Sequence, residues 1–158
     1  MKSNKKILSI DNYINEALYN KKFGYYMKKN PFGEKGDFVT SPNISILFSE
    51  MIALWIVSFW KYLKCPKKFN LIELGAGNGS MMKEIINTFE KFPNIKRSCK
   101  IYIYEKSIYL KNIQKKNLKK KNITWLKDLN KLPKNPNIFI ANEFFDALPI
   151  KQFIKKKK

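Results

Sequence analysis

Apolar residues at the start of the chain recur at helical spacing. Within residues 7–20, apolar residues stand three, four, seven and eight positions after Ile10. This spacing predicts an amphipathic helix that Ser9 or Asp11 could cap. Residues 23–40 mix glycine and proline with aromatic side chains, a pattern that predicts a structured loop. The chain is therefore expected to open with one short helix and then a loop long enough to have a function of its own.

A long apolar helix is predicted next. Ser41 is a suitable cap, and Pro42 suits the first helical position because the N–H that proline lacks has no partner there in any case. The apolar stripe that follows runs to Leu63, and it predicts a helix that packs into the core.

After this helix, short apolar runs alternate with helical segments. The predicted strands cover residues 69–74, 100–105, 123–126 and 137–142, and the predicted helices cover residues 80–92 and 108–118. Strands that alternate with helices indicate a parallel sheet with right-handed crossovers, and the strands are rich in apolar residues, as strands buried on both faces should be. The pattern predicts an α/β fold with helices on both faces of the sheet.

The composition is that of one globular domain. The chain has 158 residues, of which 44% are hydrophobic and 28% are charged, so it can bury a sizeable core. The longest strongly apolar run covers residues 51–60, half of the roughly 20 residues that a membrane-spanning helix needs. No membrane span is predicted.

The charge and the reactive side chains narrow the possible functions. A formal net charge of +20 would ordinarily favour a nucleic-acid partner, but Arg97 is the sole arginine, and proteins that read bases favour the bidentate guanidinium. We predict no specific nucleic-acid partner.

The absence of histidine excludes imidazole bases, serine triads and most zinc sites, while Cys65 and Cys99 lack a metal-binding spacing. We predict free thiols and no metal.

The sharpest local motif is a glycine loop between a predicted strand and a predicted helix. Gly75, Gly77 and Gly79 follow Glu73 in the pattern GxGxG, while Ser80 occupies the place where a dinucleotide fingerprint needs glycine. The pattern favours S-adenosylmethionine over a dinucleotide, because Glu73 and backbone carbonyls could accept hydrogen bonds from the methionine ammonium. A glycine-rich turn that binds nothing is the alternative.

Two further carboxylates follow predicted strands. Glu105 ends the second strand, where a carboxylate can accept hydrogen bonds from both ribose hydroxyls. Asp128 follows the third strand, where an acceptor could hold the adenine amino group. Ordinary surface charge is the alternative for Glu105.

The fourth predicted strand leads into a motif with two carboxylates, residues 142–149. Glu143 and Phe144 stand where a DNA adenine methyltransferase would carry prolines, which argues against methylation of a base. Glu143 and Asp146 would suit a cationic acceptor such as a guanidinium, which they could orient through charge-assisted hydrogen bonds. They could also be helix caps.

Three motifs together resemble the MidA family of class I S-adenosylmethionine-dependent methyltransferases: residues 36–45, 73–79 and 142–153. The resemblance implies a Rossmann-like methyltransferase that dimethylates an arginine of a complex I core subunit, in the mitochondrial matrix or the bacterial cytoplasm. It also implies that the loop containing Thr40 and Ser41 closes over the cofactor and the substrate. Residues 1–64 would then form helices and a covering loop, and residues 65–158 the cofactor-binding core.

The chain is much shorter than members of that family, which run to well over twice its length. We therefore expect a truncated or split gene product with an incomplete sheet, in which the fourth strand is an exposed edge. Such a chain could need its missing carboxyl half or a second copy. A non-catalytic assembly or binding module and a nucleic-acid methyltransferase remain alternatives, and a steep salt dependence of binding would favour the latter.

Overall fold

The computed structural model describes residues 7–28, 31–32, 36–38, 42, 45–119 and 121–155. Its elements, in chain order, are α1 (Ile10–Tyr19), α2 (Tyr25–Lys28), α4 (Ile46–Tyr62), β1 (Phe69–Leu74), α5 (Ser80–Phe89), α6 (Pro93–Ser98), β2 (Cys99–Tyr104), α7 (Ile108–Asn117), β3 (Ile123–Leu126), the 3-10 helix η1 (Leu129–Lys131) and β4 (Asn137–Ile140). None of the described helices is long and apolar enough to cross a bilayer.

The strands form one sheet in the order β3-β2-β1-β4, and every pair is parallel, which confirms the predicted parallel sheet. β1 and β2 occupy the centre and pair in register from Phe69 opposite Cys99 to Leu74 opposite Tyr104. β4 pairs with β1 and forms one edge, as predicted. All six residues of β1 are buried, and four of them are apolar, while Asn70 and Glu73 are buried polar residues.

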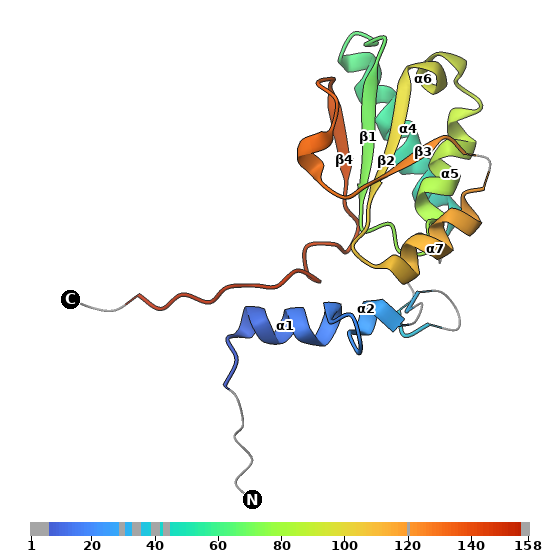
Figure 1. Ribbon diagram of the computed structural model, residues 1–158. Helices are drawn as coiled ribbons and strands as arrows, with labels where there is room; N and C mark the ends of the chain where they lie inside the picture. The colour runs from blue at the N-terminus through green and yellow to red at the C-terminus, as the bar shows by residue number, and fades with distance from the viewer. Residues whose placement is uncertain are drawn as a thin grey trace, which may run out of the picture.

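The two faces of the sheet are covered differently. Helices α4 and α5 pack on one face and build the larger core, and Figure 1 shows α4 passing behind the strands. This core includes Ala53 and Ile56 from α4, Met82 and Ile85 from α5, and Phe69, Leu71, Ile103 and Ile138 from the strands. On the other face, Leu129 and Leu132 of the η1 region cover a smaller apolar cluster around Ile72.

The helices differ from the predictions mainly in where α4 begins, in an additional helical turn and in where α5 ends. The long helix begins at Ile46, because Ser45 has extended backbone angles and its Oγ accepts a hydrogen bond from the Leu47 N–H at 3.2 Å. A single helical turn, α2, occurs inside the predicted loop. The helix predicted over residues 80–92 ends at Phe89, and Pro93 begins a separate helix in the position that suits proline.

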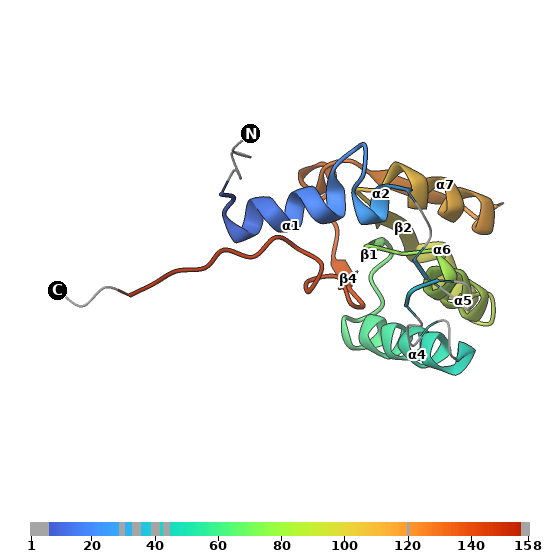
Figure 2. The same cartoon turned by 90° about the horizontal axis from the view of Figure 1, so that it is seen from below.

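Helices α1 and α2 lie outside these layers. In Figure 1 the strands run downward, and both helices lie below their carboxyl ends. Figure 2, seen from that side, shows the segment after β4 passing next to α1. α1 has no buried residue, so it stays in place through a few specific contacts instead of a core of its own.

Candidate functional site

The glycine loop after β1 forms the floor of the candidate site. Gly75, Gly77 and Gly79 have φ angles of 67°, 53° and 85°, a left-handed region that residues with side chains avoid. A Cβ on Gly75 would lie 2.6 Å from the Phe144 ring, and a Cβ on Gly77 would lie 3.2 Å from the Phe32 ring. The loop therefore needs glycine for both backbone conformation and close approach.

A cavity of about 240 Å³ opens at the carboxyl ends of β1 and β2. Its lining combines the glycine loop, carboxylates and aromatic rings: Tyr19, Tyr26, Phe32, Gly75, Gly77, Tyr104, Glu105, Lys106, Leu110, Glu143, Phe144, Ala147, Leu148 and Pro149. The structure thus brings Gly75, Gly77, Glu105 and Glu143, predicted separately along the sequence, to one cavity.

A smaller hollow of about 40 Å³ adjoins this cavity and shares the glycine loop and Glu143 with it. Glu73 lines the hollow and is 2% exposed, and its Oε2 has no hydrogen-bond partner among the described residues. Burial, with the charge of Glu105 as a smaller cause, raises the pKa of Glu73 to about 8. A buried carboxyl oxygen without a partner is a suitable acceptor for a donor group on a ligand.

Glu105 faces the main cavity with its carboxylate held at both ends. Oε1 accepts a hydrogen bond from the Ser107 N–H at 2.8 Å, and Oε2 accepts one from Gln114 Nε2 at 2.9 Å. Burial raises the pKa of Glu105, while these two donors act in the opposite direction. Each oxygen retains a second lone pair, so the carboxylate can still accept hydrogen bonds from a ligand.

Sequence reasoning missed the aromatic wall of the cavity, which comes from α1, α2 and Phe32. The rings of Tyr19 and Tyr26 stack at 5.8 Å between centroids, and those of Tyr26 and Phe32 at 6.3 Å. The Tyr19 hydroxyl donates to the Ala147 carbonyl at 2.9 Å, which joins α1 to the segment after β4. Burial is the main cause that raises the pKa of Tyr19 to about 12.

Sequence reasoning also missed Gln114, although a signal was present. Leu110 and Leu118 lie four residues before and after it, on the buried face of α7, so a polar residue between them calls for hydrogen-bond partners. Gln114 is fully buried and contacts both Glu105 and the glycine loop.

The two acidic residues predicted near the acceptor substrate occupy different positions. Glu143 lines both hollows, and its φ of 48° is a strained conformation for a residue with a side chain. Asp146 is exposed and lies outside both sets of lining residues, but its charge contributes to the raised pKa of both Tyr19 and Tyr26. Neither carboxylate caps a helix among the described elements.

The remaining predicted residues lie away from the two hollows or outside the described residues. Asp128 is the N-cap of η1, and its Oδ1 accepts a hydrogen bond from the Asn130 N–H at 2.9 Å. Gly79 precedes the first residue of α5, and a Cβ there would meet Leu118 instead of the cavity. Thr40 and Ser41 lie outside the described residues.

The site is rich in acidic side chains although the chain as a whole is basic. Among the described residues, the lining of the two hollows contains three acidic side chains, Glu73, Glu105 and Glu143, and one lysine, Lys106, in a chain with a formal net charge of +20. The Lys106 Nζ lies 4.0 Å from the centroid of the Tyr19 ring. Carboxylates and aromatic faces together favour a ligand that carries positive charge.

Comparison with protein families matches residues 51–158 to a family described as "Putative S-adenosyl-L-methionine-dependent methyltransferase". The chain is also similar to curated proteins named protein arginine methyltransferase NDUFAF7, mitochondrial. It is 34% identical to that of Xenopus laevis over 95% of this chain and 40% of the relative, and 33% identical to that of Homo sapiens over 94% and 39%. The chain therefore spans about two fifths of the length of these relatives.

Solved structures support the fold. A superfamily member from Burkholderia thailandensis, described as a likely methyl transferase bound to S-adenosyl-homocysteine, matches with a TM-score of 0.74 at 23% identity. The match covers 90% of this chain and 38% of that protein. A native structure of a protein of the same superfamily and organism matches with a TM-score of 0.66.

Proposed function

The chain belongs to this S-adenosyl-L-methionine-dependent methyltransferase family, and from this premise we propose that its two adjoining hollows bind S-adenosylmethionine for methyl transfer to a protein side chain. The observation that carries the proposal is the placement of Glu73 and Glu105 on either side of a glycine loop that leaves room for a ligand. Within residues 1–64, α1, α2 and Phe32 would cover the site, whereas α4 packs on the sheet and would belong with residues 65–155 to the core.

The residues of the site fit the chemical groups of this cofactor. The Glu73 carboxyl would accept a hydrogen bond from the methionine ammonium, since its Oε2 is buried and lacks a partner among the described residues. Glu105 would accept hydrogen bonds from the two ribose hydroxyls. Bound there, S-adenosylmethionine would supply a methyl group on a positively charged sulfur, which the aromatic and acidic lining favours.

We propose an arginine side chain as the methyl acceptor, because the relatives are named protein arginine methyltransferases. Glu143 and Asp146 would hold the guanidinium by charge-assisted hydrogen bonds and orient one nitrogen toward the methyl carbon. Methyl transfer would form a nitrogen–carbon bond as the sulfur–carbon bond breaks and would leave the sulfur neutral, and the nitrogen would release its proton to a carboxylate or to water. The family resemblance further suggests a core subunit of respiratory complex I as the target, in the mitochondrial matrix or the bacterial cytoplasm.

Calorimetric titration of the 158-residue chain with S-adenosylmethionine tests the proposal. We expect saturable binding by the wild type and its loss in Gly77→Val, because a side chain there is strained and directed at the Phe32 ring. Lys100→Ala, at the opposite end of the strands, is the control and should bind like the wild type. Circular dichroism of each protein establishes folding, and a folded wild type that does not bind would contradict the proposal.

A further inference from the structure

The side-chain amide of Gln114 has an orientation that its neighbours fix completely. Gln114 Oε1 accepts a hydrogen bond from Trp125 Nε1 at 2.9 Å. An indole N–H is only a donor, so the amide oxygen must face Trp125 and the amide nitrogen must face the other way. There Nε2 donates to the Gly77 carbonyl and to Glu105 Oε2, both at 2.9 Å.

These contacts join three parts of the sheet's carboxyl edge through one side chain. Gly77 lies in the loop after β1, Glu105 follows β2, and Trp125 belongs to β3. Since Ser107 holds the other oxygen of Glu105, the carboxylate cannot rotate without losing one of its two donors. Gln114 itself is fully buried and belongs to the lining of neither hollow.

We propose that Gln114 is a positioning residue of the cofactor site, which directs the Glu105 carboxylate toward the ribose hydroxyls and holds the glycine loop at Gly77. The inference rests on the proposed function, because it takes the ribose of S-adenosylmethionine as the ligand of Glu105. Gln114 acts through Glu105 and Gly77 and touches no ligand atom.

The hydrogen bond from Gln114 also favours the ionised form of Glu105. Burial raises the pKa of Glu105, while, besides Gln114, the backbone N–H groups of Ser107 and Lys106 and the Lys111 ammonium lower it. Burial and, to a smaller degree, the charge of Glu105 in turn raise the pKa of its neighbours Glu73, Tyr19 and Tyr26. Removal of the amide donor raises the pKa of Glu105 further. If ribose binding needs the ionised carboxylate, the pH profile of binding shifts to higher pH in the absence of Gln114.

The test measures the affinity for S-adenosylhomocysteine and for its 2′-deoxyribose analogue, in the wild type and in Gln114→Met. Methionine has a similar volume but no donor. We expect the wild type to prefer the natural ribose and Gln114→Met to bind S-adenosylhomocysteine about tenfold more weakly, as expected for loss of hydrogen bonds to a charged group. The preference for the natural ribose should largely disappear in the variant. The dependence of S-adenosylhomocysteine affinity on pH should also shift to higher pH.

Asn117→Met is the matched control. Asn117 lies one turn further along α7, and its Nδ2 donates to the Asn78 carbonyl of the same loop at 2.9 Å, with no bond to Glu105. We expect this variant to keep the preference for the natural ribose. If contacts between α7 side chains and the glycine loop set the ribose preference, both variants would lose it.

A second variant keeps the inference testable if Gln114→Met does not fold. Gln114→Leu removes the donor without adding a titratable group beside Glu105, so the ribose preference should again disappear. A folded variant at position 114 that keeps the wild-type preference overturns the inference. A folded wild type that does not bind S-adenosylhomocysteine overturns the proposed function, and the inference with it.

Discussion

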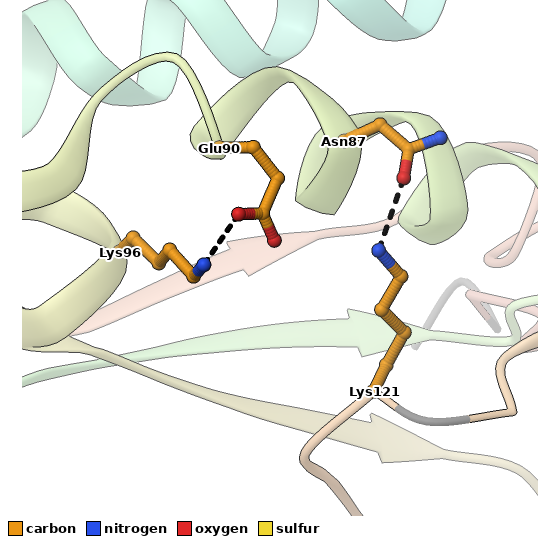
Figure 3. Close-up of polar contacts among 4 residues, drawn as sticks. All are labelled: Asn87, Glu90, Lys96 and Lys121. Carbon is orange, nitrogen blue, oxygen red and sulfur yellow. Dashed lines mark hydrogen bonds and ion pairs between the residues drawn. The ribbon is translucent and has the colours of Figure 1, made fainter.

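The two ends of the parallel strands both carry a hollow, and the larger one is not the candidate site. At the amino ends of β2 and β3 lies a hollow of about 490 Å³ lined by Lys96, Lys100 and Lys121 among others, against about 240 Å³ for the main cavity at the carboxyl ends. The Lys96 ammonium forms an ion pair with Glu90, and Lys121 Nζ donates to Asn87 Oδ1 at 3.1 Å (Figure 3). These are contacts between flexible surface groups.

The carboxyl ends of the strands differ from the amino ends because they contain groups that lower the stability of the folded state. Glu73 is a buried carboxyl whose Oε2 has no partner in the part of the chain that the structure describes, and Glu143 has a left-handed backbone conformation. Such features persist where the surrounding structure enforces them, and they concentrate at functional sites. On this comparison, we select the candidate site by its buried, strained and acidic groups and not by the volume of the hollow.

The largest expected effect is that of Gly75→Val, at the carboxyl end. Gly75 has a φ of 67°, and a Cβ would lie 2.6 Å from the Phe144 ring. We expect loss of S-adenosylmethionine binding and a decrease in the free energy of unfolding of at least about 1–2 kcal/mol from the backbone strain. Denaturant unfolding and calorimetry measure the two effects.

The variant Gly79→Ala introduces backbone strain in the glycine loop without placing a side chain in either hollow. Gly79 also has a positive φ, but its Cβ would meet Leu118, away from both hollows. The free energy of unfolding of Gly79→Ala should fall. Its affinity for S-adenosylmethionine should change much less than that of Gly75→Val. Equal losses of affinity would show that the loop responds as a unit to strain.

The buried carboxyl of Glu73 predicts an unusual dependence of stability on pH. Its pKa is raised to about 8 from 4.5, so the folded state binds more protons than the unfolded state between these values. The stability contribution is therefore complete below about pH 4.5 and is lost as the pH rises toward 8, by an amount on the order of a few kcal/mol. Glu73→Gln, which stays neutral, should remove this part of the decline.

Denaturant unfolding of the ligand-free wild type and Glu73→Gln at pH 5, 7 and 9 tests this expectation. The difference between the two proteins isolates Glu73, because Glu105 also has a raised pKa and remains in both. Glu73→Gln should gain stability relative to the wild type as the pH rises. If the free energies of unfolding of the two proteins changed in parallel with pH, the Glu73 carboxyl would not titrate in this range.

The elements of the sheet were predictable from the sequence because their signals are local. β1 and β3 have the bounds that were predicted, since each is a short apolar run ended by polar or turn-forming residues. The glycine loop and the strand-end carboxylates follow from the same reasoning, because parallel strands bring their carboxyl ends to one edge.

The aromatic wall could not be predicted, because it depends on contacts between distant parts of the chain. The hydrogen bond from Tyr19 to Ala147 joins residues 128 positions apart, and α1 has no buried stripe that would indicate where it packs. The role of Asp128 was uncertain for a related reason. An aspartate after a strand can face a ligand or cap the next turn, and the structure shows that Asp128 caps η1.

The smallest expected effect is that of Lys96→Ala, at the amino ends of the strands. The side chains of Lys96 and Glu90 are 54% and 47% exposed, so water and salt screen their ion pair. We expect no measurable change in the unfolding midpoint at physiological salt and none in S-adenosylmethionine affinity. Loss of cofactor affinity in this variant would mean that the two ends of the sheet are coupled, and the contrast between them would then fail. An unchanged affinity, beside its loss in Gly75→Val, would assign ligand binding to the carboxyl ends alone.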